Sequence, residues 1–142
     1  FSRRPDVQID LLKKSWATEI LVLFNLKLKV IGNPIFPDES CILVGNHIGY
    51  LDIPVLMQTC PDISFVSKEE VRFWPIIGNA AKKIKTIFVE RKDKNSREKA
   101  KDEIAQVLLE EKQRVLIFPS GTTSIKTSSL WKKGAFEIAI RN

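Results

Sequence analysis

Short apolar runs alternate with longer amphipathic segments along the chain. Four mostly apolar runs are typical of buried β-strands, and they span 41–44, 63–66, 86–89 and 115–118. Helical patterns span 6–24, 51–59, 95–113 and 131–140. Shorter helical pieces are expected within 68–83, and a further short strand at 28–31. Because strands alternate with helices, the pattern predicts an α/β domain with a mostly parallel layered sheet flanked by helices.

The first predicted helix, 6–24, is amphipathic. Its apolar residues recur in steps of three and four and form one stripe: Ile9, Leu12, Trp16, Ile20 and Leu23. Lys13 and Lys14 lie off this stripe. The stripe fits a helix that lies on a membrane surface, and equally a helix packed on the domain's own core. The apolar segment 74–77 leaves a similar choice open, between contact with lipid or an acyl chain and burial in the core.

The clearest helical pattern spans 95–113. Asn95 can cap its first turn, with Glu98 three residues later as in a capping box. Four apolar residues then share one face of the helix: Ala100, Ile104, Val107 and Leu108.

Length and composition are those of an ordinary globular domain. The chain has 142 residues, of which 44% are hydrophobic and 28% charged, so we expect one domain. No apolar run approaches the roughly 20 residues that span a bilayer, and residues 1–5 lack the apolar region of a secretory signal. Two cysteines do not make a disulfide framework. With one histidine and two scattered cysteines, a structural zinc site would need an unusual set of ligands, so we expect none.

The positive charge is concentrated in one segment. The chain has a net charge of +6, and nine basic and three acidic residues between Lys82 and Lys101 account for the same excess. Such a run suits phosphate groups, whether in nucleic acid, anionic lipid or a phosphorylated substrate. A solvated helix face explains it equally well. Aromatic residues suited to base stacking do not interleave with the run, so we expect no nucleic-acid partner.

Three polar clusters follow predicted strands. Asn46 and His47 follow the first, Arg91 follows another, and Ser120–Thr122 follows the last. In parallel α/β sheets, active sites gather in loops beyond the carboxyl ends of the strands. The sequence therefore predicts a site built from these three loops.

His47 is the only histidine, and Asp52 follows it by five residues. A turn between them can fold the carboxylate back onto the imidazole, which fixes the tautomer and leaves the other ring nitrogen to take a proton from a hydroxyl. Spacing alone also fits a capping aspartate beside a hydrogen-bonded surface histidine.

Four blocks of the sequence decide between these interpretations. Residues 46–52, Asn-His-Ile-Gly-Tyr-Leu-Asp, resemble the NHxxxxD motif of the glycerolipid acyltransferases, the family of lysophosphatidic acid acyltransferases. Residues 85–91, which end in Phe-Val-Glu-Arg, resemble the second block of that family. Residues 118–124, Phe-Pro-Ser-Gly-Thr-Thr-Ser, resemble the third, and residues 131–136 resemble the segment that follows it. The blocks occur in family order, and the resemblance covers roughly residues 25–142.

The resemblance implies acyl transfer without an acyl-enzyme. His47, oriented by Asp52, is the expected general base for the transfer of a fatty acyl group from acyl-CoA or acyl carrier protein to the sn-2 hydroxyl of 1-acylglycerol 3-phosphate. Acceptor binding is assigned by the resemblance to five residues: Asn46, Arg91, Ser120, Gly121 and Thr122. Backbone N–H groups of the third block would bind phosphate or a developing oxyanion.

Two departures from the family pattern affect the substrate and the extent of the domain. The third block has Ser120 where the family usually has Glu, and Thr123 where it usually has Arg, which puts the phosphate contact in question. The fourth block of the family is absent before Asn142, so we expect a C-terminally shortened domain. In this interpretation residues 1–26 form an amphipathic helix that can face a membrane, and 27–142 form an incomplete catalytic α/β core.

The resemblance also sets the expected partners and the rival functions. We expect a lysophospholipid acceptor, a thioester co-substrate without a bound cofactor or metal, and an anionic membrane surface on its cytoplasmic face. An acyltransferase for another hydroxylated lipid, or a catalytically silent lipid-binding module of the same fold, are the alternatives. A nucleophilic Ser120 is a further rival, although Phe118–Gly121 is not a G-x-S-x-G elbow.

Overall fold

Four parallel strands form the centre of the part of the chain that the structure describes. The computed structural model of the protein describes residues 7–32, 40–121, 123 and 131–141. Its strands, β1 (Ile42–Val44), β2 (Ile63–Lys68), β3 (Ile87–Val89) and β4 (Arg114–Ile117), form one sheet in the order β1-β4-β2-β3. All three pairings are parallel. The predicted α/β class with a parallel sheet is therefore confirmed.

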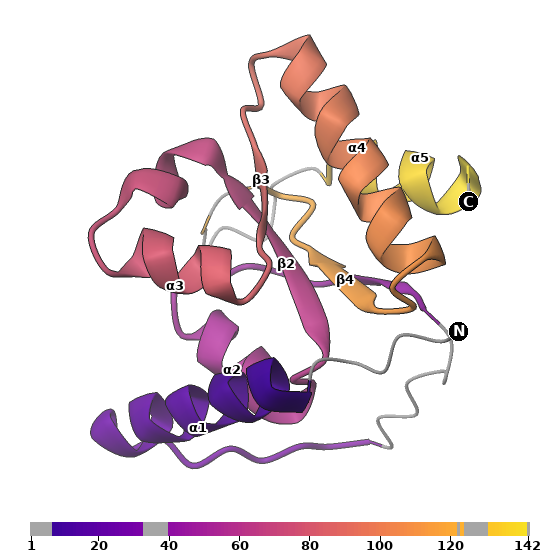
Figure 1. The fold of residues 1–142 in the computed structure, drawn as a ribbon. Coiled ribbons are helices and arrows are strands. Elements are labelled where there is room, and N and C mark those ends of the chain that lie inside the picture. The colour runs from indigo at the N-terminus through magenta and orange to yellow at the C-terminus, as the bar shows by residue number, and fades with distance from the viewer. Residues whose placement is uncertain (1–6, 33–39, 122, 124–130, 142) are drawn as a thin grey trace.

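Helices cover both faces of the sheet, as Figure 1 shows. They are α1 (Val7–Leu23), α2 (Asp52–Thr59), the 3-10 helix η1 (Glu69–Phe73), α3 (Ile77–Lys83), α4 (Lys94–Leu109) and α5 (Gly134–Arg141). α4 and α5 pack on one face, and α1 and α2 lie on the other (Figure 1). The predicted strand at 28–31 is wrong. Leu28, Val30 and Ile31 are exposed, and none of the four strands pairs with them, so their backbone lacks the partner that a strand requires.

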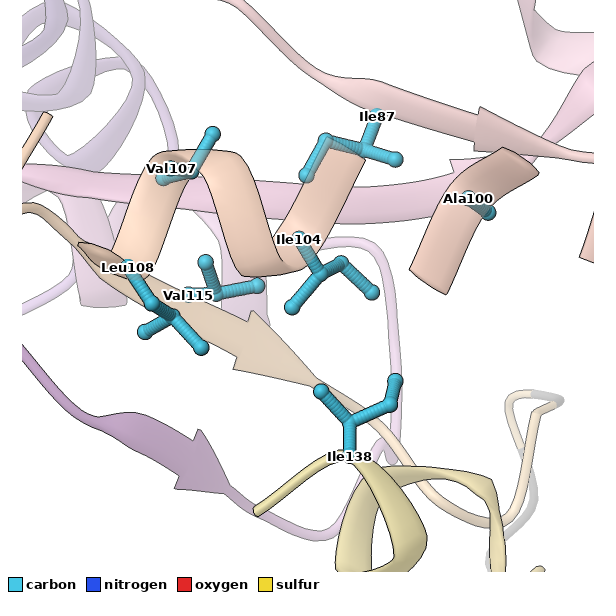
Figure 2. Close-up of a cluster of buried hydrophobic side chains, with 7 residues drawn as sticks. All are labelled: Ile87, Ala100, Ile104, Val107, Leu108, Val115 and Ile138. Atoms are coloured by element: carbon cyan, nitrogen blue, oxygen red, sulfur yellow. The ribbon is translucent and has the colours of Figure 1, made fainter. Parts of the chain in front are cut away.

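Two hydrophobic clusters hold the layers together. One joins α4 and α5 to the sheet, and Figure 2 shows its members Ile104, Val115 and Ile138 side by side. The other joins α1 and α2 to the opposite face through Ala17, Met57 and Leu116 among others. Because side chains alternate along a strand, consecutive residues Val115 and Leu116 of β4 belong to different clusters. Each cluster therefore fixes one face of the same central strand.

The inward face of α1 differs from the predicted apolar stripe. The helix buries Lys13, Ala17 and Leu21, which recur every fourth residue, and it packs on α2. Trp16 is 46% exposed and Leu23 is 75% exposed. Lys13 tolerates burial because its ammonium group donates to the carbonyl oxygens of Pro61 and Ile63, at 2.9 Å each. The sector that contacts the domain is therefore separate from most of the apolar stripe, which stays on the surface.

The first turn of α4 is capped by a residue that the sequence pattern did not select. Asp93, rather than Asn95, is the N-cap, and its carboxylate accepts from the backbone N–H groups of Asn95 and Ser96 at 3.0 and 3.2 Å. The predicted cap and capping box at Asn95 are wrong by two residues. The helix also ends at Leu109, four residues before the predicted end.

The basic run 82–101 is spread over several elements. Lys82 and Lys83 end α3, and the members from Lys94 onward lie on α4. Lys85, Arg91 and Lys92 lie in the turns between elements. The helices α3 and α4 lie on opposite sides of β3 in Figure 1. Several cations of the run are paired, as Lys85 is with Glu111 at 3.4 Å. The run therefore contributes positive charge to two surfaces of the domain. Within the described residues, no helix has the length and apolar character needed to cross a membrane.

Candidate active site

The predicted site residues lie beyond the carboxyl ends of β1, β3 and β4. Because the strands are parallel, these ends share one edge of the sheet. The structure joins the predicted residues in two groups at this edge. His47 contacts Asp52 and Phe118, and Arg91 contacts Gly121. Phe118 and Gly121 belong to the same short loop after β4, so that loop connects the two groups.

His47 and Asp52 form the contact that their spacing predicts. Nδ1 of His47 lies 2.8 Å from Oδ2 of Asp52. The two side chains are 17% and 27% exposed, so the pair is partly shielded and still open to a substrate. With the proton on Nδ1, the imidazole donates to the carboxylate and Nε2 carries the free lone pair. This arrangement suits a general base that acts through Nε2.

The carboxylate of Asp52 is fixed by the same turn that presents His47. Its Oδ2 also accepts from the backbone N–H groups of Ile48 at 2.7 Å and Gly49 at 3.1 Å. The turn is closed by the backbone N–H of Asp52, which donates to the carbonyl oxygen of Gly49. Asp52 is the first residue of α2, where the helix dipole favours a negative charge. One oxygen atom therefore holds both the loop and the imidazole.

Phe118 is a site residue to which the sequence analysis gave no role. Its ring is stacked on the imidazole of His47, with the ring centroids 4.1 Å apart and the planes inclined by 11°. The available signal was its position, at the end of an apolar strand and directly before the third polar cluster. Apolar residues at strand ends are usually assigned to the core, and Phe118 does pack against the α1–α2 cluster as well.

Arg91 and Gly121 connect the second and third loops. Nη1 of Arg91 donates to the carbonyl oxygen of Gly121. Burial lowers the pKa of Arg91 below the usual arginine value, and the nearby Glu70 carboxylate acts in the opposite direction. Gly121 has a φ of +71°, and a Cβ there would lie 2.6 Å from Nη1 of Arg91. The backbone conformation therefore favours glycine at this position, and a Cβ would also force the guanidinium of Arg91 to move.

The remaining predicted residues lie next to these two groups in the chain. Asn46 is exposed beside His47, and Ser120 is partly buried between Phe118 and Gly121 in the chain. Thr122 lies outside the described residues.

A second polar cluster lies at the opposite edge of the sheet, where β2 and β4 begin. Asp62 pairs with Nη1 of Arg114 and accepts from the thiol of Cys60 at 3.2 Å. Burial, assisted by the hydrogen bond to Asp62, raises the pKa of Cys60 to about 12. The thiol is therefore protonated and unreactive at neutral pH. This cluster fastens the starts of two strands and lies away from the His47 edge.

Comparisons with known proteins agree with the predicted fold and the predicted family. The sequence model of the family described as Acyltransferase matches residues 27–142. A lyso-ornithine lipid O-acyltransferase of Pseudomonas aeruginosa is 35% identical over 116 residues, which is 80% of this chain and 42% of the relative. A 1-acyl-sn-glycerol-3-phosphate acyltransferase alpha of Mus musculus is 32% identical over 122 residues, which is 84% of this chain and 43% of the relative. The chain thus spans about two fifths of the length of these curated relatives.

A solved structure shares the fold. The crystal structure of the 1-acyl-sn-glycerophosphate (LPA) acyltransferase PlsC from Thermotoga maritima matches with a TM-score of 0.73 and 23% sequence identity. The match covers 93% of this chain and 53% of that one. The parallel sheet with helices on both faces is therefore the arrangement found in that acyltransferase.

Proposed function

The chain belongs to the acyltransferase family, together with these lysolipid acyltransferases, and from that premise we propose that it contains the catalytic residues of a lysolipid O-acyltransferase. The reaction moves a fatty acyl group from a thioester to a lipid hydroxyl. The observation that carries the proposal is the 2.8 Å contact between Nδ1 of His47 and Asp52, which leaves Nε2 of a partly shielded imidazole available as a base.

The proposed reaction uses His47 as base and then as acid. Nε2 takes the proton of the acceptor hydroxyl while its oxygen attacks the thioester carbonyl carbon. The resulting imidazolium is stabilised by the carboxylate of Asp52. Collapse of the tetrahedral intermediate breaks the carbon–sulfur bond, and the imidazolium returns the proton to the leaving thiolate. General-base help of this kind is worth roughly 10²–10⁴-fold in rate.

We propose 1-acylglycerol 3-phosphate as the acceptor, with Arg91 as its phosphate contact. Nη1 of Arg91 is held by Gly121, so the guanidinium is anchored at the edge of the sheet that carries His47. A guanidinium retains its charge despite the lowered pKa, and it binds phosphate through a planar set of donors. The mouse and human 1-acyl-sn-glycerol-3-phosphate acyltransferases among the relatives, 32% and 31% identical, support this acceptor.

A lyso-ornithine lipid is the second candidate acceptor. Thr123 is exposed and neutral at the position where the sequence pattern of the family usually supplies a guanidinium for phosphate. Lyso-ornithine lipid O-acyltransferases of Pseudomonas aeruginosa and Brucella abortus are 35% and 36% identical to this chain. An ornithine headgroup presents a carboxylate in place of a phosphate, and Arg91 can bind either group.

The donor and the membrane complete the proposal. Acyl-CoA and acyl carrier protein are both thioesters that satisfy the reaction. The exposed apolar residues of α1, such as Leu12, Trp16 and Leu23, suit a helix that lies in the interface of a membrane. Such an orientation, on the cytoplasmic face, would bring the site to lipid acceptors.

Acceptor-dependent thiol release by His47 variants tests the proposed reaction. The protein is incubated with acyl-CoA, or with acyl carrier protein, and with each lysolipid, and free thiol is measured with a chromogenic disulfide. The rate of His47→Ala should be at least roughly 10²-fold below that of wild type, and its melting temperature should be unchanged. A rate within a few-fold of wild type would contradict the role of His47. Lipid binding without acceptor-dependent thiol release by the wild type would favour a catalytically silent module.

The acceptor is tested by Arg91→Ala, with Lys94→Ala as a control that removes an exposed cation of α4. Arg91→Ala should raise the KM for the phosphate-bearing acceptor strongly and the KM for the donor little, because a hydrogen bond to a charged group contributes about 1.5–3 kcal/mol. Equal effects on the phosphate-bearing acceptor and on an acceptor that carries neither phosphate nor carboxylate would assign Arg91 a structural role. A wild-type preference for the ornithine acceptor would replace the first candidate by the second.

A further inference from the structure

We propose that Phe118 is a positioning residue for His47, whose ring sets the plane of the catalytic imidazole; this inference rests on the proposed function. The observation is the stacked pair itself, with centroids 4.1 Å apart and planes inclined by 11°. No part of the proposed reaction requires an aromatic residue at 118. The geometry nevertheless places one against the only imidazole of the chain.

The stack supplies a restraint that Asp52 does not. The imidazole is attached through its own Cβ and hydrogen-bonded through Nδ1, at 2.8 Å from Asp52. Two such points still allow the ring plane to tilt about the line that joins them. A flat ring against one face removes this tilt and so fixes the direction of the Nε2 lone pair. Because proton transfer depends on that direction, the plane of the ring is a catalytic variable.

Phe118 is itself held by the fold. It directly follows β4 and packs against the cluster that joins α1 and α2 to the sheet. Its carbonyl oxygen accepts from the backbone N–H of Gly121 at 2.9 Å, which closes the turn after the strand. Gly45, just after β1, lies beneath the edge of the ring, since a Cβ there would be 3.9 Å from Cε1 of Phe118. The imidazole is thus supported by a side chain that belongs to the core.

An aromatic ring offers more than volume. During proton abstraction His47 becomes an imidazolium, and a cation is attracted to the face of a π-system. An aliphatic side chain would fill a similar space without this attraction and without a flat surface. Activity should therefore follow the presence of a ring at 118, so that tyrosine retains it and leucine does not.

The experiment compares Phe118→Leu and Phe118→Tyr with Phe88→Leu as the matched control. Phe88 is a buried phenylalanine on β3, at the other end of the strand order from β1, and its ring contacts the guanidinium of Arg72 in place of His47. Its substitution therefore removes the same atoms from the interior at a different site. With the lysolipid acceptors above, Phe118→Leu should lower kcat roughly 10- to 100-fold, with both KM values within threefold of wild type, because only the alignment of the base is lost. Phe118→Tyr should stay within about threefold of wild type. Melting temperatures of all variants are measured alongside.

A second readout does not depend on activity. The chain has one histidine, so the Cε1–H and Cδ2–H signals of an NMR spectrum report on His47 alone. Ring-current shielding by Phe118 should displace these signals upfield in the wild type and in Phe118→Tyr. Phe118→Leu should move them downfield, and Phe88→Leu should leave them unchanged.

Three results would overturn the inference. The first is equal kcat for the leucine and tyrosine variants. The second is an equal loss of kcat in Phe118→Leu and Phe88→Leu that follows their melting temperatures. The third is an unchanged His47 spectrum in Phe118→Leu. If the wild type transfers no acyl group, the proposed function fails, and the spectrum alone decides whether Phe118 fixes the imidazole.

Discussion

Replacement of Asp52 by asparagine separates the charge of this residue from its shape. In the structure Oδ2 accepts from Nδ1 of His47 and from the backbone N–H groups of Ile48 and Gly49. An asparagine side chain can place its carbonyl oxygen at the same point. Both backbone groups are donors, so they favour the oxygen over the amide NH₂ there. The substitution should therefore keep the loop and the tautomer and remove only the negative charge beside the imidazolium.

The expected loss of activity follows from that charge. Two unit charges about 4 Å apart interact by about 4 kcal/mol at an effective dielectric constant of 20. The Asp52 side chain is 27% exposed, so water screens part of this energy. We therefore expect kcat of Asp52→Asn to fall roughly 10²- to 10³-fold. In catalytic triads where the same change also reverses the tautomer, the loss is roughly 10⁴-fold.

Stability should respond differently in Asp52→Asn and Asp52→Ala. A neutral hydrogen bond contributes about 0.5–1.5 kcal/mol and a charge-assisted one about 1.5–3 kcal/mol. Alanine removes both backbone contacts and should lower the free energy of unfolding by about 2–4 kcal/mol, near the low end because the site is partly exposed. Asparagine should cost about half as much. Urea denaturation measures these differences, and thiol release measures kcat.

The refuting results are specific. If Asp52→Asn retains kcat within about threefold of wild type, the carboxylate does not stabilise the imidazolium, and the pair is a helix cap beside a surface histidine. If Asp52→Asn is destabilised as much as Asp52→Ala, asparagine does not reproduce the backbone contacts. In that case the loss of activity no longer reports on charge alone.

Three further predictions concern the rest of the molecule. Gly78→Ala should lower the free energy of unfolding by about 1–3 kcal/mol in urea denaturation, because its Cβ would lie 2.3 Å from a backbone carbonyl oxygen of η1. A Cβ at Gly134 would meet nothing within 4 Å, so Gly134→Ala should not lower the free energy of unfolding. Burial lowers the pKa of Lys13 below 10.5, so the unfolded chain binds more protons than the folded chain between the lowered value and 10.5. Wild type should therefore gain stability relative to Lys13→Met as pH rises through that window, and a difference that stays constant with pH would contradict the shift. In sedimentation, the protein should bind anionic vesicles more tightly than neutral ones, and salt should weaken this binding. Each basic residue of 82–101 near the membrane surface adds about 1 kcal/mol within a Debye length of about 8 Å. Equal binding to both vesicles, unaffected by salt, would exclude this contribution.

Most of the fold could be predicted because its signals are local. Each strand is an apolar run between polar turns, and each run recurs in the structure within about two residues. The failures occur where a local signal competes with a partner elsewhere. Asp93 and Asn95 are both good caps, and in the structure Asp93 takes this place, with its carboxylate accepting from the backbone N–H groups of Asn95 and Ser96. Residues 28–31 look like a strand but have no neighbouring strand to pair with.

The orientation of α1 shows a different limit of the pattern. An apolar stripe predicts the inward face of a helix only if the surroundings are water. Here the inward sector contains Lys13, whose charge is satisfied by carbonyl oxygens at the start of β2. Ala17 is fully buried and lets α1 approach α2 closely. Hydrophobicity alone could not reveal either contact, because both depend on residues far along the chain, 48 and 50 positions away for Lys13.

The sequence could predict those contacts of the candidate site that join residues close together in the chain. The carboxylate of Asp52 reaches His47 because Asp52 begins α2 and the turn 48–51 doubles back over it. An inserted residue would rotate the side chain by about 100° around the helix axis and break the contact. Spacing, turn and chemistry therefore constrain the same atoms, so the spacing could indicate the contact, whereas the resemblance to the family was needed to favour a catalytic role for it. Phe118 reaches the same imidazole from β4, where its apolar character already has an explanation in the core. A residue that serves the core and the site together gives the sequence no separate signal, so its second role becomes visible only through the fold.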